Sequence, residues 1–361
     1  MAESIFAPLG SAAPSMLFVG DFTVWQTAAG LAEGFRRLGW DVTEVSSNDA
    51  LLHSRSLGLR AAGRLLYPAA RRSHNADILA AADRVAPHVM LTVKGNFIAA
   101  ATLKELRRRG IATVNFYPDR DFDHDGMPAD ALDQFDLVAT TKAYQLPHLT
   151  ERLGKDRVAM IHHGYVPAVH RRRTPAGEIP AYLWDVSFIG NASPEKLAWL
   201  EPVARAIGDA RMIVIGNRWS ELAAGTAVAP HVFGGPLVGD QFARAIEHSR
   251  INIAVHHGAG GAQGWADQVS TRSFEIPACG GFMLHIDNAE IRTLFEPGRE
   301  IDTFADPTEL VAKVEHCLAH DADRRAIADA GHARAVPAYS LHARAVELTG
   351  IFADRVPMAF R

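Results

Sequence analysis

The sequence predicts an α/β fold of two doubly wound domains, and three observations favour it. Short apolar runs that end in glycine or polar residues, such as 16–19 and 186–189, alternate with stretches of helical periodicity. The chain of 361 residues is long for one domain and suits two of about 150–200 residues each. Prolines, a glycine and an arginine run at 166–180 are typical of a link between domains. We therefore expect one domain at 1–168 and a second at 169–339.

The first half opens with a β–loop–α–β pattern. After the apolar run 16–19, Leu31 and Phe35 recur at helical spacing, and Gly39 stops the helix before a strand at 42–45. This order is typical of the start of a doubly wound sheet.

Ligands of such folds bind beyond the carboxyl ends of the strands. Gly20 and Asp21 follow the first strand, and Lys94 follows a strand expected at 89–93. These three residues are therefore candidates for a ligand-binding edge, although Gly20 is equally compatible with a simple turn.

The second half repeats the alternation. Strands are expected at 186–189, 212–215, 251–255 and 282–286, and helices from Pro194, from Ser270 or Thr271, over 309–335 and over 339–348. Two of these strands run into Gly190-Asn191 and Gly216-Asn217-Arg218. Glycine at such a turn can bring the backbone close to a phosphate, although a glycine after a strand is commonly no more than a turn residue.

The segment D-Q-V-S-T-R-S-F-E-I-P-A-C-G-G at 267–281 concentrates groups that suit a sugar nucleotide. Free amides at the start of its helix favour an anion, and Arg272 in the first turn adds a positive charge. The carboxylate of Glu275 can accept two hydrogen bonds from a ribose diol, and Asp267 precedes it by eight positions. The alternative is that Arg272 and Glu275 form only an i,i+3 ion pair on a solvated helix face.

This segment resembles a known motif. D-x7-E followed by I-P-A-C-G-G-F resembles the E-x7-E segment of retaining glycosyltransferases with the GT-B fold. The fuller pattern, with F-E-P-G-R-E-I and F-A-D-P-T-E-L, is most similar to the CgeB-like (spore-maturation-like) glycosyltransferases. The resemblance implies two Rossmann-like domains facing a central cleft, with the acceptor on the first domain and the nucleotide sugar on the second. It also implies that 340–361 packs back on the first domain.

The resemblance further implies roles for individual residues. Glu275 would hold the nucleotide ribose and Asp267 the donor sugar, although aspartate is shorter than the glutamate of the motif. The other expected donor-site residues are Arg272, Thr271, Gly190, Asn191, Lys196, Gly216, Asn217, Arg218, Phe233, Gly234 and His257. The reaction would be retaining hexosyl transfer without a metal or other cofactor, with a UDP-sugar as the default donor.

The acidic cluster P-D-R-D-F-D-H-D-G follows a strand expected at 114–117. It matches the first half of an EF-hand loop, but Leu132 stands where the bidentate glutamate should be. We expect Asp119, Asp123 or His124 to orient the acceptor hydroxyl or the donor sugar at the rim of the cleft. A solvated acidic loop is the alternative.

Residues 51–72 interleave leucines with five arginines. Such a stretch can lie on an anionic membrane or bind an acidic acceptor. Arginine stems more often cover apolar surface while their heads remain in water.

Composition and charge exclude several classes. A net charge of −4 argues against nucleic acid as a necessary partner. Two cysteines provide neither a disulfide framework nor a zinc pattern, and no signal peptide or run of about 20 apolar residues stands out, so a cytoplasmic protein is expected. The pairs His162-His163 and His256-His257 do not predict zinc, because neighbouring strand residues face opposite sides.

Three rival functions remain open. A nucleotide-sugar epimerase would use the same fold and a similar pocket. An NAD-dependent oxidoreductase would use the glycine-rich loop G-A-G-G-A-Q-G, but the acid expected about twenty residues later is missing as a clean signal. A binding protein would keep the pocket without turnover.

Overall fold

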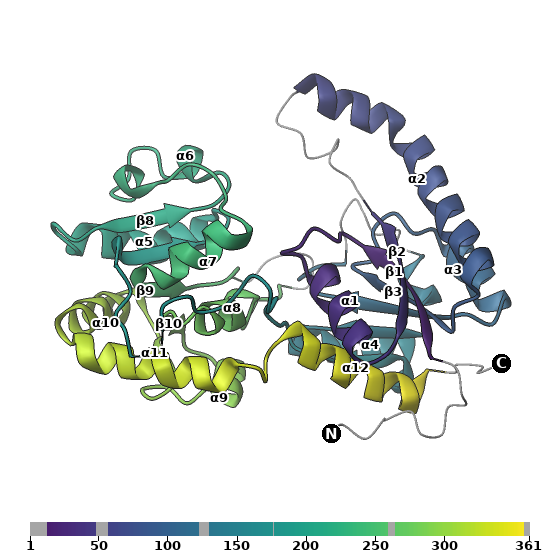
Figure 1. The fold of residues 1–361 in the computed structure, drawn as a ribbon. Coiled ribbons are helices and arrows are strands. Elements are labelled where there is room, and N and C mark those ends of the chain that lie inside the picture. Colours follow the sequence, from purple (N-terminus) through teal and green to yellow (C-terminus); the bar gives the residue numbers. More distant parts are fainter. Residues whose placement is uncertain (1–12, 48–56, 123–129, 176, 259–263, 357–361) are drawn as a thin grey trace. The chain divides into compact units, whose positions relative to one another are not determined.

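The computed structural model describes residues 13–47, 57–122, 130–175, 177–258 and 264–356. The chain divides into two compact units, Met1–His162 with Leu341–Arg361, and His163–Ser340 (Figure 1). Each unit is built on its own parallel sheet. The expected fold class, α/β with two Rossmann-like domains, is therefore confirmed.

The first unit has a six-stranded parallel sheet in the order β2-β1-β3-β4-β5-β6. Its strands are β1 (Ser15–Gly20), β2 (Asp41–Ser46), β3 (Val89–Val93), β4 (Ala112–Tyr117), β5 (Leu137–Thr140) and β6 (Val158–Met160). Its helices are α1 (Thr27–Arg37), α2 (Leu57–Val85), α3 (Ala100–Arg108), α4 (Leu146–Leu153) and α12 (Leu341–Arg355), with short 3₁₀ turns at Leu132–Gln134, Ala143–Gln145 and Lys155–Arg157. The central strands are buried on both faces, and for this reason they are continuous apolar runs in the sequence.

Helix α12 belongs to the first unit although it is last in the chain, and it lies beside α1 (Figure 1). Two glycines of α1 allow this close contact. A Cβ on Gly30 would lie 2.5 Å from a methyl of Leu341, and a Cβ on Gly34 would lie 2.8 Å from the Cβ of Ala345. Farther along, the rings of Phe35 and Phe352 stack with centroids 5.9 Å apart.

The second unit has a five-stranded parallel sheet in the order β11-β10-β9-β7-β8. Its strands are β7 (Trp184–Ile189), β8 (Met212–Ile215), β9 (Ser249–Ala254), β10 (Met283–Ile286) and β11 (Asp302–Phe304). Its helices are α5 (Pro194–Ala206), α6 (Trp219–Leu222), α7 (Gly239–Glu247), α8 (Arg272–Ala278), α9 (Ala289–Leu294), α10 (Pro307–Ala319) and α11 (Asp321–Ala335), with a 3₁₀ turn at Ala229–His231.

Local signals fix several helix starts. Ser193 caps α5 by accepting a hydrogen bond from the amide of Lys196 at 3.4 Å, and Pro194 takes the first helical position, as the sequence predicts. Asp306 caps α10 by accepting from two amides of the first turn.

The structure refines two expectations about helices. The helical run expected over 309–335 is two helices, α10 and α11, because the backbone leaves helical geometry at His320. Helix α8 begins at Arg272 with Thr271 at the N-cap position, so the expected start near Ser270 or Thr271 is confirmed, although the Thr271 side chain makes no capping hydrogen bond. The Ser270 hydroxyl does accept from the Arg272 amide, at 3.3 Å.

Residues 51–56 of the basic stretch lie outside the described residues, and from Leu57 onward the stretch belongs to α2. No helix in the described parts of the chain is long and apolar enough to cross a bilayer.

Strand order places one switch point in each sheet. After β1 the chain forms β2 on one side and then β3 on the other, so adjacent connections diverge between β1 and β3. In the second sheet they diverge between β7 and β9. In open α/β sheets, ligands bind in the crevice beyond the carboxyl ends of strands at such points.

Candidate functional site

Two glycine turns meet at the carboxyl ends of β7 and β8. Gly216 has φ +151°, and a Cβ there would lie 2.1 Å from the carbonyl oxygen of Gly190. The same Gly190 oxygen accepts a hydrogen bond from the indole N–H of the fully buried Trp219 at 2.7 Å. Asn191 accepts from Asn217 through both the backbone amide (3.2 Å) and the side-chain amide (3.0 Å). The two predicted turns therefore form one interlocked backbone surface.

A buried ammonium group lies beside this surface. Lys196 is 5% exposed, and its Nζ donates to the carbonyl of Asn191 at 3.1 Å. The same Nζ lies 3.4 Å from Nε2 of His257. The carbonyl of His257 in turn accepts from the amide of Asp267 at 3.0 Å. Asn191 with Lys196, His257 and Asp267 were thus predicted from three separate segments, and the fold brings these segments together.

Two exposed side chains follow β8. Arg218 is exposed, has a left-handed backbone at φ +65°, and makes no ion pair with any residue that the structure describes. Phe233 is 57% exposed, and its amide donates to the carbonyl of Val214 on β8 at 2.9 Å. Gly234 follows at φ +102°. An arginine and an aromatic ring are therefore available to solvent near one strand end.

Arg272 and Glu275 are ion-paired with each other at the start of α8. The guanidinium also donates to the carbonyl of Ile189 at 2.9 Å and to the Thr271 hydroxyl at 3.2 Å. It lies over the ring of Phe242, 4.4 Å from the centroid. The i,i+3 pair of the alternative interpretation is thus present, but Glu275 is only 8% exposed, so the pair is not on a solvated face.

A buried histidine adjoins this pair. Nδ1 of His170 accepts from the Val166 amide at 3.0 Å, so the proton of the neutral ring is on Nε2. That Nε2 lies 3.7 Å from a carboxylate oxygen of Glu275. Burial lowers the pKa of His170, against the raising effect of the Glu275 charge. A neutral His170 therefore faces Glu275.

A second histidine pair ties α8 to the strands beneath it. Nε2 of His285 lies 2.9 Å from Nε2 of His256 and 2.9 Å from the hydroxyl of Ser273. Nδ1 of His285 is 2.6 Å from the Ile286 carbonyl and carries the proton of the neutral ring, so Nε2 is the acceptor nitrogen that faces both neighbours. Burial lowers the pKa of His285 to about 4. His256 is buried and His257 is exposed, and both follow the end of β9.

The first-unit candidates that the structure describes lie at or beyond the carboxyl ends of β1, β3 and β4. Gly20 packs β1 against α1, because a Cβ there would be 2.7 Å from the Cβ of Ala28. One carboxylate oxygen of Asp21 accepts from the amide (2.9 Å) and hydroxyl (2.6 Å) of Thr23. The ammonium of Lys94 is 3.0 Å from Asp119. Asp123 and His124 lie outside the described residues.

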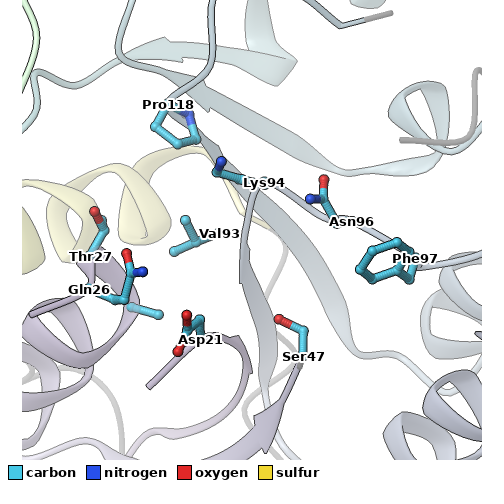
Figure 2. Close-up of a pocket in the computed structure, with 10 residues that line it drawn as sticks. Asp21, Gln26, Thr27, Ser47, Val93, Lys94, Asn96, Phe97 and Pro118 are labelled. Carbon is cyan, nitrogen blue, oxygen red and sulfur yellow. The ribbon is translucent and has the colours of Figure 1, made fainter. Parts of the chain in front are cut away.

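A pocket of about 260 Å³ opens at this switch point (Figure 2). It is lined by Asp21, Gln26, Thr27, Ala28, Ser47, Val93, Lys94, Asn96, Phe97 and Pro118. Sequence reasoning found Asp21 and Lys94 but missed the others. Ser47 follows β2 and could have been found from its place at a strand end, whereas Asn96 and Phe97 carry no such signal.

In the second unit the sequence missed His170 and Phe242, which contact Glu275 and Arg272 from distant segments. Among the described residues, no group of three or more His, Cys, Asp or Glu side chains is placed to hold a metal ion.

Residues 196–350 match a family model described as "Glycosyl transferase-like". No curated protein sequence matches the chain significantly. Among solved structures, sucrose-phosphate synthase (tll1590) from Thermosynechococcus elongatus has a TM-score of 0.64 at 12% identity, covering 94% of this chain and 98% of that one. Anabaena Alr3699/HepE in complex with UDP has a TM-score of 0.62 at 11% identity, covering 94% and 100%.

A putative UDP-N-acetylglucosamine 2-epimerase from Listeria monocytogenes is also similar, with a TM-score of 0.56 at 11% identity, covering 95% and 97%. At these identities the structures establish the fold. The family model adds a sequence match across most of the second unit and into α12. Residues 196–350 are therefore glycosyl transferase-like in sequence, and the chain has the GT-B fold.

Proposed function

We propose that the protein is a glycosyltransferase that binds a nucleoside-diphosphate sugar at the carboxyl edge of the second sheet and transfers the sugar to an acceptor hydroxyl. One observation carries the proposal: the interlocked turns of Gly190 and Gly216 follow β7 and β8, beside the β7–β9 switch point, and Lys196 and Arg218 supply positive charge next to them. Exposed backbone and fixed positive charge are what a diphosphate requires. Lys196, Gly216 and Arg218 lie within the glycosyl transferase-like segment 196–350, and Gly190 lies just before it.

Each part of the donor has a candidate partner. The diphosphate lies against the two glycine turns, with Lys196 and Arg218 as its cations. The exposed Phe233 ring offers a face to the base, and Glu275 accepts from the ribose. Asp267, held to His257 through its amide, contacts the transferred sugar.

In the transfer step the bond between the anomeric carbon and the leaving phosphate oxygen breaks. The acceptor oxygen forms the new bond to that carbon, and its proton goes to the departing nucleoside diphosphate. Negative charge grows on the diphosphate as the bond breaks. Cations and amides already fixed at that place stabilise the transition state without reorganising, which is the largest contribution in many enzymes.

The finer assignments are also proposals. We propose a UDP-hexose as donor, supported by the complex of Anabaena Alr3699/HepE with UDP. Retention of anomeric configuration and membership of the CgeB-like group are supported by the D-x7-E pattern and its flanking motifs. Lys196, Arg218 and Arg272 supply positive charge in place of a metal, and no organic cofactor takes part. Among the residues that the structure describes, Asp119, which is paired with Lys94, is the acid that we propose orients the acceptor hydroxyl or the donor sugar.

Nucleotide binding tests the proposal. Thermal denaturation is measured with UDP, GDP, dTDP, CMP and NAD on wild type, Lys196→Met and Arg218→Ala. A ligand at a hundred times its Kd adds about 2.7 kcal/mol of stability. One nucleoside diphosphate, UDP by our proposal, stabilises the wild type, and each substitution weakens its binding about tenfold or more, which is about 1.4 kcal/mol.

Arg299→Ala is the matched control. Arg299 is a 73% exposed arginine of the same unit that precedes β11, so it lies at the opposite, amino edge of the sheet. This variant keeps wild-type affinity. A response to NAD alone, or equal affinities for Arg218→Ala and Arg299→Ala, contradicts the proposal. Slow release of UDP from UDP-glucose without an acceptor separates a transferase from an epimerase and from a protein that only binds.

A further inference from the structure

The pocket at the β1–β3 switch point is lined by several polar side-chain atoms that form no hydrogen bond within the part of the chain that the structure describes. The second carboxylate oxygen of Asp21 and the hydroxyls of Thr27 and Ser47 make no hydrogen bond with the residues that the structure describes. The same holds for the side-chain amide of Asn96, whose Oδ1 is buried and has no partner. Buried polar groups are bonded in the great majority of cases, so an orphaned buried oxygen beside a pocket calls for a partner from outside the chain, a water or a ligand.

Backbone strain marks the same place. Lys94 and Phe97 have left-handed backbones at φ +70° and +68°, which side chains with a Cβ rarely adopt. Such strain persists only where the surroundings impose it, and it gathers at ligand sites. The turn that contains both residues therefore needs support from elsewhere in the fold.

Two buried asparagines supply that support. The amide of Asn115 on β4 donates to the carbonyl of Lys94 at 3.0 Å, and the amide of Asn75 on α2 donates to the carbonyl of Phe97 at 2.8 Å. Asn75 also accepts from the amide of Ala99 at 2.8 Å and from the hydroxyl of Thr102 at 2.6 Å. The turn is thus held from two other elements in a conformation that presents Lys94 and Asn96 to the pocket (Figure 2).

The charges of the pocket indicate what it accepts. Lys94 is already paired with Asp119, and the free oxygen of Asp21 adds a negative charge. A phosphate or carboxylate would therefore meet repulsion from Asp21 and a cation that is already neutralised. Hydroxyl groups both donate and accept, so they can satisfy Asn96, Ser47 and Asp21 together.

The volume of the pocket further limits the class of ligand that it can bind. A volume of about 260 Å³ lies just below the range of about 300–1,000 Å³ that is typical of sites for drug-sized ligands. One sugar ring suits such a space better than a long chain does. The Phe97 and Val93 side chains give the pocket an apolar wall for the carbon-bound hydrogens of that ring.

We propose that this pocket binds the acceptor through a neutral, hydroxyl-rich monosaccharide unit, and that Asp21 excludes anionic sugars. The proposal rests on the proposed function, because it identifies the chemical class of the acceptor in that reaction. It concerns a pocket formed by the first unit alone, so it can be tested apart from donor binding.

Ligand-detected NMR on the full chain with saturating UDP provides the test. The probes are glucose, galactose, N-acetylglucosamine, glucuronate and glycerol 3-phosphate. At least one neutral sugar binds, and it binds more tightly than either anion. Asn96→Ala and Ser47→Ala each weaken that binding severalfold to tenfold, whereas Ser73→Ala, a change at an exposed serine of α2, leaves it unchanged.

Asp21→Asn gives a sharper readout. The amide oxygen of asparagine can still accept from Thr23, so the loop is kept while its charge is lost. Glucuronate then gains affinity relative to glucose. Tighter binding of an anion by the wild type, no binding of any neutral sugar, or an unchanged preference in Asp21→Asn overturns the proposal. Loss of the UDP response with sugar binding intact instead contradicts the donor assignment, so the two failures are distinguishable.

Discussion

Replacing Gly216 by alanine tests the close contact between the β7 and β8 turns on which the proposed donor site depends. Two effects add. The backbone at φ +151° costs a residue with a Cβ about 1–3 kcal/mol. The new Cβ would also displace the Gly190 oxygen, 2.1 Å away, from the buried indole N–H of Trp219. An unsatisfied buried donor costs about 1–3 kcal/mol.

We therefore expect Gly216→Ala to lower the free energy of unfolding by roughly 3 kcal/mol or more. For a unit of this size each kcal/mol lowers Tm by about 2–4 °C, so the shift is on the order of 10 °C by calorimetry. Donor affinity falls as well, because the displaced carbonyl belongs to the proposed phosphate turn.

Gly225→Ala is the matched control. Gly225 also has a left-handed backbone, at φ +78°, but a Cβ there would meet no heavy atom of the described chain within 4 Å. It should cost only the conformational strain, about 1–2 kcal/mol, and leave UDP affinity unchanged. If Gly216→Ala loses no more stability than Gly225→Ala and binds UDP equally well, the contact between the turns has no energetic importance and the reasoning is refuted.

Three further predictions concern Glu275, His285 and Asn96. Glu275→Gln removes one charge of its largely buried pair with Arg272, so urea denaturation should show a loss of about 2 kcal/mol; an unchanged midpoint would mean that the pair contributes nothing. The pKa of His285 is lowered to about 4 in the folded protein. The contribution of the neutral ring to the free energy of unfolding is therefore fully present above pH 6.5, and up to about 3 kcal/mol of it is lost as the pH falls from 6.5 to 4. His285→Gln should flatten that part of the stability profile, and an equally steep profile in the variant would assign the slope to other groups. Asn96→Ala removes an unsatisfied buried oxygen, so the free energy of unfolding should stay level or rise by up to about 1 kcal/mol, and Tm should not fall. A clear fall in Tm would show that the amide has a structural partner.

Strand positions could be predicted because of how parallel sheets are buried. The run 89–93 was expected as a strand and is β3, and 212–215 is β8, since strands covered on both faces show little but apolar residues. Helix boundaries were less accurate. The break between α10 and α11 was missed because apolar spacing continues across His320, where neither proline nor glycine marks the end of a helix.

Residues of the candidate site could be predicted from the sequence only where they closely follow a predicted strand. Lys196, Arg218 and His257 follow β7, β8 and β9 closely, and strand ends of one parallel sheet share an edge. His170 was not found, because it precedes its partner Glu275 by more than a hundred residues and no local pattern links them. Asn96 was missed for a different reason: an asparagine after a lysine and a glycine predicts a turn and says nothing of its orphaned oxygen.

Backbone strain supplies what sequence patterns lack. In the part of the chain that the structure describes, four non-glycine residues have positive φ, and three of them, Lys94, Phe97 and Arg218, follow the carboxyl end of a strand at or beside a switch point. Glycine would remove this strain at each position, so stability does not account for lysine, phenylalanine and arginine there. Their side chains do: one ammonium, one ring and one guanidinium lie where the two proposed ligands bind. Both sheets thus place strained side chains beyond the carboxyl end of a strand, β3 in the first unit and β8 in the second, which favours the proposed sugar acceptor and charged donor on separate units.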